Sequence, residues 1–462
     1  MWSGRFREPL NTAFENWQRS FPFDWRLLPQ EIAASKAHAR MIASAGILTP
    51  DELAAMLRGL DAVQSSAPAM IASSPAEDIH HFVELELTRE IGDLALKLHT
   101  GRSRNEQIAT DMRLFVREAI DATLDRLHTW MKALLEQAAH AEDAVMPSYT
   151  HLQRAEPVLV AHWLLAYVSM LERDYSRLVD ARKRMNLCPL GSGAVAGATL
   201  ALDRTIAANA LAFDGPTRNS MDATSDRDFA LEFTQAASVL GIHISRFAEE
   251  LTLYSSAEFG FLDLPEAFST GSSAMPQKKN PDLTELVRGK SGRLLGAAIT
   301  LSTLIKGLPL AYNKDLQEGQ EPVFDVVNTL EGMLQVLPDF TRALRFRFER
   351  MQSASESGYL NAMAAATYLV YKGVPFRKAH EKIGNAVRYC VDKGCELGDL
   401  NLDELRQFGP EFEEDFFAGI TLRATLDCHD VIGGTATRQV KDALIAAEDR
   451  IAALAGAIHA GA

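Results

Sequence analysis

The chain has 462 residues, with 47 Lys and Arg against 61 Asp and Glu, so its formal net charge is −14. A chain this acidic repels phosphate backbones, which excludes nonspecific nucleic-acid binding. Its apolar share of 47% and charged share of 23% are those of an ordinary globular protein, so disordered and collagen-like classes are excluded too. The length predicts about three domains, or one long helical body with end pieces.

Residues 1–103 contain short helical pieces interrupted by Pro and Ser, and longer apolar stripes of helical period begin after them. The stripes cover 106–138, 158–185, 229–254 and 282–305, with 323–349 as a candidate fifth. The clearest stripe, at about 1.5 Å per residue, is about 38 Å long; its members are Phe229, Phe233, Ala236, Leu240, Ile244, Phe247, Leu251 and Tyr254. No stretch of alternating β-branched residues competes, which predicts an all-α, antiparallel bundle.

A shorter pattern follows the polar segment SASESG at 353–358, with breakers at Gly373-Val374-Pro375 and at Gly433-Gly434. These changes predict three parts: an N-terminal helical domain at 1–103, a central helical bundle at 104–353, and a small C-terminal helical domain at 354–462.

Cysteine use and the apolar stretches favour a soluble cytoplasmic protein without membrane contact. The first ten residues lack the apolar core of a secretory signal. The apolar stretch at 294–305 falls short of the roughly 18 residues that span a bilayer. Neither a disulfide framework nor a CxxC spacing is formed by the four cysteines, Cys188, Cys390, Cys395 and Cys428.

The segment TGSSAMPQKKNPDLTELVRGK at 270–290 combines a loop with a helix start. Gly271 and two serines indicate a mobile loop, and Asn280-Pro281 resembles an N-cap followed by proline at the first helical position. Two adjacent lysines add positive charge where the helix dipole already attracts anions. A serine beside this charge can lose its proton or stabilise an oxyanion. The alternative is a solvated loop that only caps a helix.

Three further segments bring polar groups to the ends of the predicted long helices. Arg102, Arg104 and Asn105 in HTGRSRNEQ suit carboxylate binding, or else pair with the protein's own acids. His151 in YTHLQRAEP is suited to proton transfer, although such a histidine is more often structural. LAYNKDLQEGQEPVFD at 310–325 is either functional or a surface turn. Together these segments predict a site for a multiply carboxylated small molecule.

The segment EDIHHFVE at 77–84 places Asp78 beside His80 and His81. Metal binding is conceivable there, but two adjacent histidines with scattered acids lack a recognised ligand spacing. We therefore predict no metal site.

At these segments the sequence resembles the fumarase/aspartase superfamily, whose GSSxMPxKxNP signature is present as GSSAMPQKKNP. Within it, KLHTGRSRN, DATSDRDF and YNKDLQE resemble the argininosuccinate lyase family. The resemblance runs nearly end to end. It implies a homotetramer whose central helices form a 20-helix core, with active sites shared by three subunits. It also implies reversible cleavage of argininosuccinate to arginine and fumarate by anti β-elimination, without metal or organic cofactor.

The resemblance further implies a role for each matching residue. Ser272 resembles the catalytic base, with Ser273 as the less favoured neighbour. His151 resembles the acid or proton relay, oriented by Glu285. Lys278 and Asn280 would hold the fumarate-side carboxylate and the developing charge. Carboxylate oxygens would be bound by Ser103, Arg104, Asn105 and Thr150; the arginine half by Ser20, Asp24, Tyr312 and Gln317; and Asp78 and His80 would support the site.

Two departures from the family pattern stand out. The usual RSRNDQ is RSRNEQ here, which lengthens the acid at Glu106. The usual QEDKE is QEGQE, so a substrate-contacting lysine becomes Gln320 and its neighbouring acid becomes Gly319. A glutamine offers a neutral hydrogen bond in place of a charge, so we expect weaker substrate binding rather than loss of chemistry.

Two other readings follow from the same residues. The chain could be a nonenzymatic member, like the lens delta-crystallins of this fold, or a superfamily lyase with a shifted substrate. Retention of the whole catalytic set argues against the first, and Gln320 motivates the second.

Overall fold

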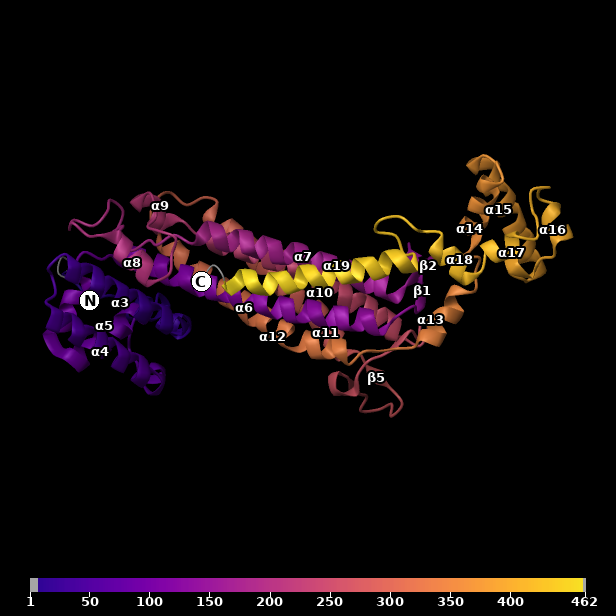
Figure 1. Cartoon of the computed structure of the whole chain (residues 1–462). Helices are drawn as coiled ribbons and strands as arrows, with labels where there is room; N and C mark the ends of the chain where they lie inside the picture. Colours follow the sequence, from indigo (N-terminus) through magenta and orange to yellow (C-terminus); the bar gives the residue numbers. More distant parts are fainter. Residues whose placement is uncertain (1–6, 460–462) are drawn as a thin grey trace.

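The computed structural model of the chain describes residues 7–459 and shows an elongated, largely helical subunit (Figure 1). Part of the segment for which we expect no secretory signal, residues 1–6, lies outside the described residues. The predicted all-α class is confirmed, since strands in the described part are short and form three two-stranded sheets. Within residues 7–459, no helix combines the length and apolarity needed to cross a membrane.

Five long helices run side by side along the middle of the subunit and confirm the predicted bundle (Figure 1). The predicted stripe at 229–254 is buried from Phe229 to Tyr254, because its residues recur on one face. The fifth helix was predicted to extend to residue 349, but it ends at Arg342, where the chain turns into a short strand. The five are α6 (Arg104–His140), α7 (Val160–Met185), α10 (Asp228–Ser255), α11 (Asp282–Ile305) and α12 (Gln320–Arg342).

The apolar stripe of α11 was only partly right. Leu294, Ala297 and Leu301 are buried, as the apolar stripe predicted at 282–305 requires, but Leu286 in the same stripe is 61% exposed. Two further apolar residues of this helix, Leu295 and Ile299, are 48% and 58% exposed. Helix α11 therefore presents more apolar surface than one subunit covers.

A β-hairpin was missed in the connection between α6 and α7. Strands β1 (Val145–Thr150) and β2 (Gln153–Leu159) pair antiparallel, with Thr150 opposite Gln153. The two-residue turn between them is His151-Leu152, and both residues have φ of 56°. Type I′ hairpin turns need positive φ at both positions and usually contain Asn or Gly, so this sequence carries no ordinary turn signal.

The N-terminal body has five helices in the described residues, and its helix α3 (Leu28–Ser44) packs against α6 at the start of the bundle (Figure 1). Most of the buried apolar residues of this body belong to the main core of the bundle, and the rest, on α3, pack with Leu114 of α6 and with α8 (Arg204–Ala210), so neither cluster is confined to the N-terminal body. The helices are α1 (Thr12–Trp17), α2 (Phe21–Asp24), α3 (Leu28–Ser44), α4 (Pro50–Ser66) and α5 (Ile79–Ile91), joined by the 3₁₀ turns η1 (Trp25–Leu27), η2 (Ala67–Ala69), η3 (Ile71–Ser73) and η4 (Gly92–His99).

Short elements connect the long helices at both ends of the bundle. Between α7 and α10 lie α8 (Arg204–Ala210) and α9 (Ser220–Ser225). Strand β3 pairs with β6 and strand β4 pairs with β5. These remaining connectors are β3 (Leu262–Asp263), η5 (Glu266–Phe268), β4 (Thr270–Gly271), β5 (Lys279–Asn280), η6 (Lys314–Gly319) and β6 (Arg345–Phe346).

The chain beyond α12 forms a small body at the far end of the bundle, with a hydrophobic core of its own. The last helix then runs back along the bundle beside α6 and α7, where Val440, Ala447 and Ile451 join the main core (Figure 1). The division into 1–103, 104–353 and 354–462 stays a prediction. The elements are α13 (Phe348–Ser355), α14 (Ala362–Tyr371), α15 (Phe376–Lys393), η7 (Leu397–Asp399), α16 (Leu402–Arg406), α17 (Phe416–Gly419), α18 (Leu422–Asp427) and α19 (Thr437–His459).

Candidate active site

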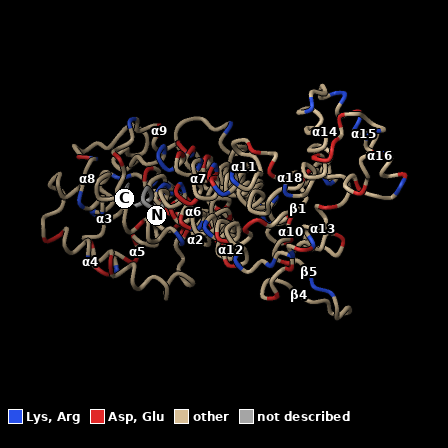
Figure 2. The backbone as a smooth tube through the Cα atoms, turned by 45° about the vertical axis from the view of Figure 1, so that its right-hand side comes forward, with Lys and Arg blue, Asp and Glu red and all other residues tan. Residues whose placement is uncertain are grey.

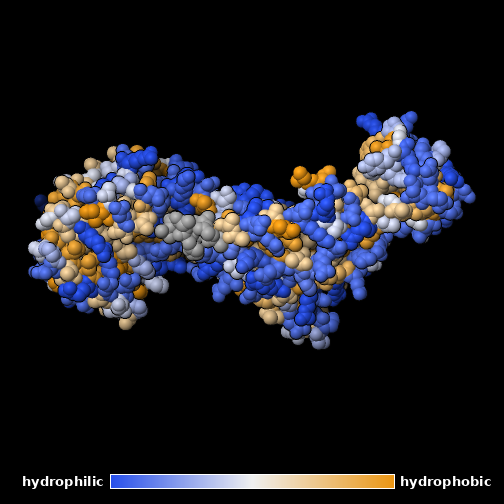
Figure 3. All heavy atoms as spheres, in the orientation of Figure 1, coloured by the Kyte–Doolittle hydropathy of each residue, from blue (hydrophilic) through white to orange (hydrophobic). Residues whose placement is uncertain are grey.

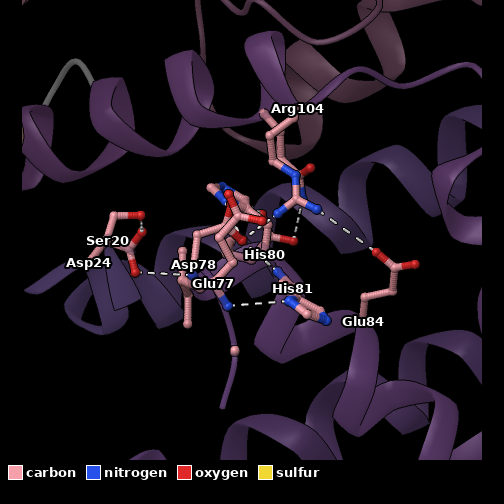
Figure 4. A network of polar contacts seen from close by, with 12 residues as sticks. Ser20, Asp24, Glu77, Asp78, His80, His81, Glu84 and Arg104 are labelled. Carbon is pink, nitrogen blue, oxygen red and sulfur yellow. Dashed lines mark hydrogen bonds and ion pairs between the residues drawn. The ribbon is translucent and has the colours of Figure 1, made fainter. Parts of the chain in front are cut away.

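The structure brings several of the predicted site residues together where the N-terminal body meets α6 (Figure 4). Asp78 is the N-cap of α5 and accepts a hydrogen bond from His81 N at 2.7 Å. Its carboxylate also pairs with Arg104, the first residue of α6. The cap and the ion pair fix the arginine at a helix N-terminus, where backbone N–H groups also favour anions.

Asp24 is buried beside this pair, at 1% exposure. It accepts hydrogen bonds from Ser20 Oγ at 2.6 Å and from Ile79 N at 3.0 Å. Burial raises the pKa of Asp24 to about 7, with the nearby Asp78 charge adding to the rise and the Ser20 hydrogen bond opposing it. A carboxyl group poised near neutrality in this way is typical of functional sites.

The segment before α12 adds two predicted residues to the same region. Gln317 is 9% exposed, and its Nε2 donates to the Gln18 carbonyl at 3.1 Å. Tyr312 is half-buried near Asp78, Arg104 and Arg227, and burial raises its pKa. Arg227 is an unpredicted member, buried at 5% exposure beside Tyr312. Its position in the DATSDRDF segment was the only sequence signal for it.

Gln320 was expected to contact substrate, and the structure buries it at 3% exposure as the first residue of α12. Its Oε1 has no hydrogen-bond partner among the described residues. A Cβ added at Gly319 would come within 3.1 Å of a Leu301 methyl group, so glycine suits this close approach to α11. The expected loss of substrate affinity through Gln320 stays a prediction.

Helix α6 begins with a capping box that also anchors a distant loop. Ser103 Oγ accepts from Asn105 N at 3.3 Å, and Glu106 Oε1 accepts from Ser103 N at 3.1 Å. The other oxygen, Glu106 Oε2, accepts from Gly193 N at 2.8 Å, while Asn105 Nδ2 donates to the Ala194 carbonyl at 3.3 Å. The longer acid at this position therefore ties the PLGSGAVAG loop to the helix start.

Replacing Glu106 by alanine is expected to lower the free energy of unfolding by about 1–3 kcal/mol, because the buried Gly193 N–H and the partly buried Ser103 N–H lose their acceptor. Chemical denaturation of the purified protein measures this. Glu90→Ala, at an exposed acid of α5, is the matched control and is expected to change little. Equal effects of the two substitutions would contradict the anchoring role.

Thr150 and His151 lie far from these groups, at the tip of the β1–β2 hairpin. Both side chains are exposed, and His151 has the positive φ described above. A non-glycine residue held in this region costs about 1–3 kcal/mol and is often found at functional sites. The hairpin therefore projects His151 from the end of the bundle.

The signature loop forms a third region, between β4 and β5. It projects from the body of the subunit and carries a positively charged stretch beside β5 (Figure 2). Ser272 is half-buried, and its Oγ accepts from Ala274 N at 3.2 Å and Met275 N at 3.0 Å. Ser273 and Lys278 are exposed. The loop ends where Lys279 Nζ donates to the Leu264 carbonyl.

The expected N-cap at Asn280 was wrong. Asn280 lies in β5, opposite Thr270, and α11 starts at Asp282 with Pro281 in the cap position. Asp282 accepts hydrogen bonds from Thr270 N at 2.9 Å and Thr270 Oγ1 at 2.7 Å, so strand pairing pulls Asn280 out of the helix start. Glu285 is exposed in the first turn of α11.

One subunit cannot bring these regions into a single site. Helix α6 has 37 residues and is about 55 Å long, with Arg104 at its start and the β1–β2 hairpin after its end. A six-residue strand folding back would recover at most about 20 Å. The polar cluster around Asp78 and the exposed His151 therefore belong to different ends of the molecule.

Comparison with known proteins covers the whole chain. A family model described as Lyase matches residues 4–296, and one described as Argininosuccinate lyase C-terminal matches residues 359–427. The argininosuccinate lyase of Acidobacterium capsulatum is 63% identical over 465 residues, covering 99% of this chain and 96% of that protein. The argininosuccinate lyase of Koribacter versatilis is 55% identical and both chains are covered in full.

Two solved structures share the fold. EDDS lyase in complex with formate is 25% identical, with a TM-score of 0.85 and coverage of 98% of this chain and 93% of that one. Class II fumarase from Schistosoma mansoni is 15% identical, with a TM-score of 0.74 and coverage of 89% and 95%. With relatives at 63% and 55% identity matched over essentially the whole chain, and a family model over residues 4–296, the chain belongs to the argininosuccinate lyase family.

Proposed function

We propose that this protein cleaves argininosuccinate reversibly into arginine and fumarate. The full-length similarity to argininosuccinate lyases carries the proposal, and the clustered polar groups support it. The enzyme acts in the cytoplasm as a homotetramer and needs neither metal nor organic cofactor. The substrate carries three carboxylates and a guanidinium, which suits a site that combines Arg104 and Lys278 with Asp24 and Asp78.

The chemistry is an anti β-elimination. Ser272 removes a proton from the carbon next to a carboxylate, and the charge collects as an aci-carboxylate near Lys278 and Asn280. His151, oriented by Glu285, protonates the departing guanidino nitrogen as the carbon–nitrogen bond breaks. The backbone N–H donors at Ser272 Oγ support the base assignment, because hydrogen bonds to an oxyanion favour deprotonation.

The binding groups divide by the two halves of the substrate. Carboxylate oxygens are held by Ser103, Arg104, Asn105 and Thr150, and the fumarate-side carboxylate by Lys278 and Asn280. Asp78 and His80 support these groups, since Asp78 pairs with Arg104. The arginine half is held by Ser20, Asp24, Tyr312 and Gln317, with Gln320 at the edge of the site.

Each active site takes residues from three subunits. This assembly reconciles the required proximity of Arg104 and His151 with their separation along α6. The exposed apolar residues of α11, Leu286, Leu295 and Ile299, supply surface for subunit contact. Figure 3 shows hydrophobic residues interrupting the hydrophilic surface along the bundle.

A single assay tests the activity. Purified protein is incubated with argininosuccinate while fumarate absorbance is followed, and the oligomer mass is measured in parallel. Fumarate release by a tetramer is expected. A well-folded tetramer without turnover would favour the crystallin-like reading, and turnover of another fumarate-releasing substrate alone would favour the shifted-substrate reading.

Asp24→Asn is expected to stabilise the free protein while weakening substrate binding. The pKa of Asp24 in the folded protein is about 7, above its ordinary value of 3.8. The neutral carboxyl group therefore contributes its full stabilisation of the folded state below pH 3.8, and this stabilisation is lost as the pH rises towards 7. The amide of asparagine stays neutral at every pH, so the variant does not lose this stabilisation at high pH. We expect a melting temperature higher by roughly 2 °C or more at pH 8, a smaller gain at pH 5, and a raised KM. A lower melting temperature at pH 8 would contradict the assignment.

A further inference from the structure

Three buried titratable groups meet behind the Asp78–Arg104 pair. Glu31 of α3, His80 of α5 and Asp111 of α6 are 1%, 3% and 0% exposed. His80 Nε2 lies 2.9 Å from Asp111 Oδ2 and 3.8 Å from Glu31 Oε2. Glu31 and Asp111 were not predicted as site residues. Two carboxyl groups and an imidazole in a protein core need a defined arrangement of protons, because unpaired buried charges are costly.

The hydrogen bonds show which carboxyl group is ionised. Glu31 Oε1 accepts from Ser35 Oγ at 2.6 Å and from Gln107 Nε2 at 2.7 Å. Arg102 donates to the same Ser35 hydroxyl at 2.9 Å, which places a guanidinium next to Glu31. Donors of this kind favour the charged form of a carboxyl group. Glu31 is therefore the ionised partner.

Asp111 has a poorer environment for a negative charge. Its Oδ1 and Glu31 Oε2 are buried without a donor among the described residues, and the two carboxyl groups lie close together, with an oxygen of each within 4.8 Å of the other. A single proton on Asp111, donated to Glu31, satisfies both. Burial and the Glu31 charge raise the pKa of Asp111 well above its ordinary value, in agreement with this arrangement.

His80 is held as a cation by this pair. Burial alone would lower its pKa, but the hydrogen bond to Asp111 and the charges of Asp78 and Glu31 raise the pKa of His80 to about 10. Two arginines also lie near His80. Arg102 donates a hydrogen bond to Ser35, which in turn donates to Glu31, and Arg104 forms ion pairs with Asp78 and Glu84.

The charged imidazole connects the buried cluster to the site. His80 Nδ1 lies 3.7 Å from Asp78 Oδ1, the same oxygen that pairs with Arg104 and caps α5. Burial would raise the pKa of Asp78, but His80 and Arg104 together hold it below its ordinary value. A contact chain therefore runs from Glu31 and Asp111 through His80 and Asp78 to Arg104.

We propose that Glu31 as a carboxylate and Asp111 as a neutral acid are positioning residues, which keep His80 charged so that it fixes Asp78 and, through it, the orientation of Arg104. This inference rests on the proposed function, in which Arg104 binds a substrate carboxylate. Neither residue touches substrate, so their effect is on binding rather than on the proton-transfer steps.

Two isosteric substitutions are expected to behave differently. In Asp111→Asn, the amide accepts from His80 and donates to Glu31 as the neutral acid does, so KM and kcat should stay within about threefold of wild type. In Glu31→Gln the negative charge is lost, so KM should rise about tenfold at pH 8 with kcat nearly unchanged. This KM defect should shrink at pH 6, where His80 regains its proton. A purely structural role predicts equal losses at both pH values.

Melting temperature tests the same idea without turnover. The raised pKa of His80 gives stability that is full below 6.5 and is lost as pH rises towards 10. In Glu31→Gln that loss should come at lower pH, so its melting temperature should fall further below wild type at pH 8 than at pH 6. The melting temperature of Asp111→Asn should differ from that of wild type by the same small amount at pH 6 and at pH 8.

The outcomes separate the two proposals. If wild type releases no fumarate but the melting temperatures differ as described, the function is wrong and the charge arrangement holds. If wild type is active but both substitutions act alike, or Asp111→Asn is the more damaging, the arrangement is wrong. Glu31, His80 and Asp111 together offer three potential metal ligands. If purified wild type contained one divalent metal ion per subunit and Asp111→Asn contained none, the proposed charge arrangement would also be wrong. Glu31→Asp, which keeps the charge, serves if Glu31→Gln fails to assemble.

Discussion

Turnover of argininosuccinate should fall by at least about a thousandfold in Ser272→Ala, because the residue that removes the proton is gone. Assembly should be unaffected. Among the described residues, the Ser272 hydroxyl forms hydrogen bonds only with backbone N–H groups of its own projecting loop, and substitutions away from the core usually change stability by about 0.5 kcal/mol or less. Fumarate absorbance measures the first effect and the elution volume of the tetramer the second.

The neighbouring serine provides the matched control. Ser273 has the same chemistry one residue along, but it is exposed in the loop, and no hydrogen bond among the described residues orients its hydroxyl. Ser273→Ala should therefore keep activity near that of wild type. Activity surviving in Ser272→Ala but not in Ser273→Ala would reverse the assignment of the base.

The helical periodicity of apolar residues predicted the long helices well, because a buried face of a helix requires apolar residues at every third or fourth position. It could not say what buries each stripe. Leu286 fits the stripe of α11 and is exposed in the subunit, since periodicity does not distinguish a core within one chain from a contact between chains. The hairpin at 145–159 was missed for a different reason, because its turn is His-Leu and the residues around it include Pro147 and Pro157.

The residues of the candidate site were predicted from the family resemblance rather than from the spacing of polar residues along the sequence. Asp24, Asp78 and Arg104 are far apart in the sequence, and only the tertiary fold brings them together. Glu31 and Asp111 were missed because an acid within a helix is usually on the surface. The sequence signal that could have found Asp111 is its place beside Met112 on the buried side of α6, where a charged residue needs a partner.

Two inactive variants should restore activity when their subunits are mixed. Arg104→Gln removes a group from one end of the subunit and His151→Asn a group from the other. If each site takes these residues from different subunits, random reassembly gives about a quarter of the sites both intact residues. Neither pure variant contains such a site. Mixing equal amounts, dissociating and reassembling the tetramers, and following fumarate absorbance measures the recovery.

A second mixture, of two variants altered in the same region of the subunit, tests whether mixing restores activity for a reason other than shared active sites. Arg104→Gln and Asp78→Asn alter residues that form an ion pair in the same subunit, so every site that receives this region carries one defect or the other. No recovery is expected from that mixture. Recovery there would show that mixing itself rescues the variants, and failure of the Arg104→Gln and His151→Asn mixture in reassembled tetramers would refute sites built from several subunits. The roughly 55 Å length of α6 makes this the decisive comparison, because the elimination requires both residues at one substrate molecule.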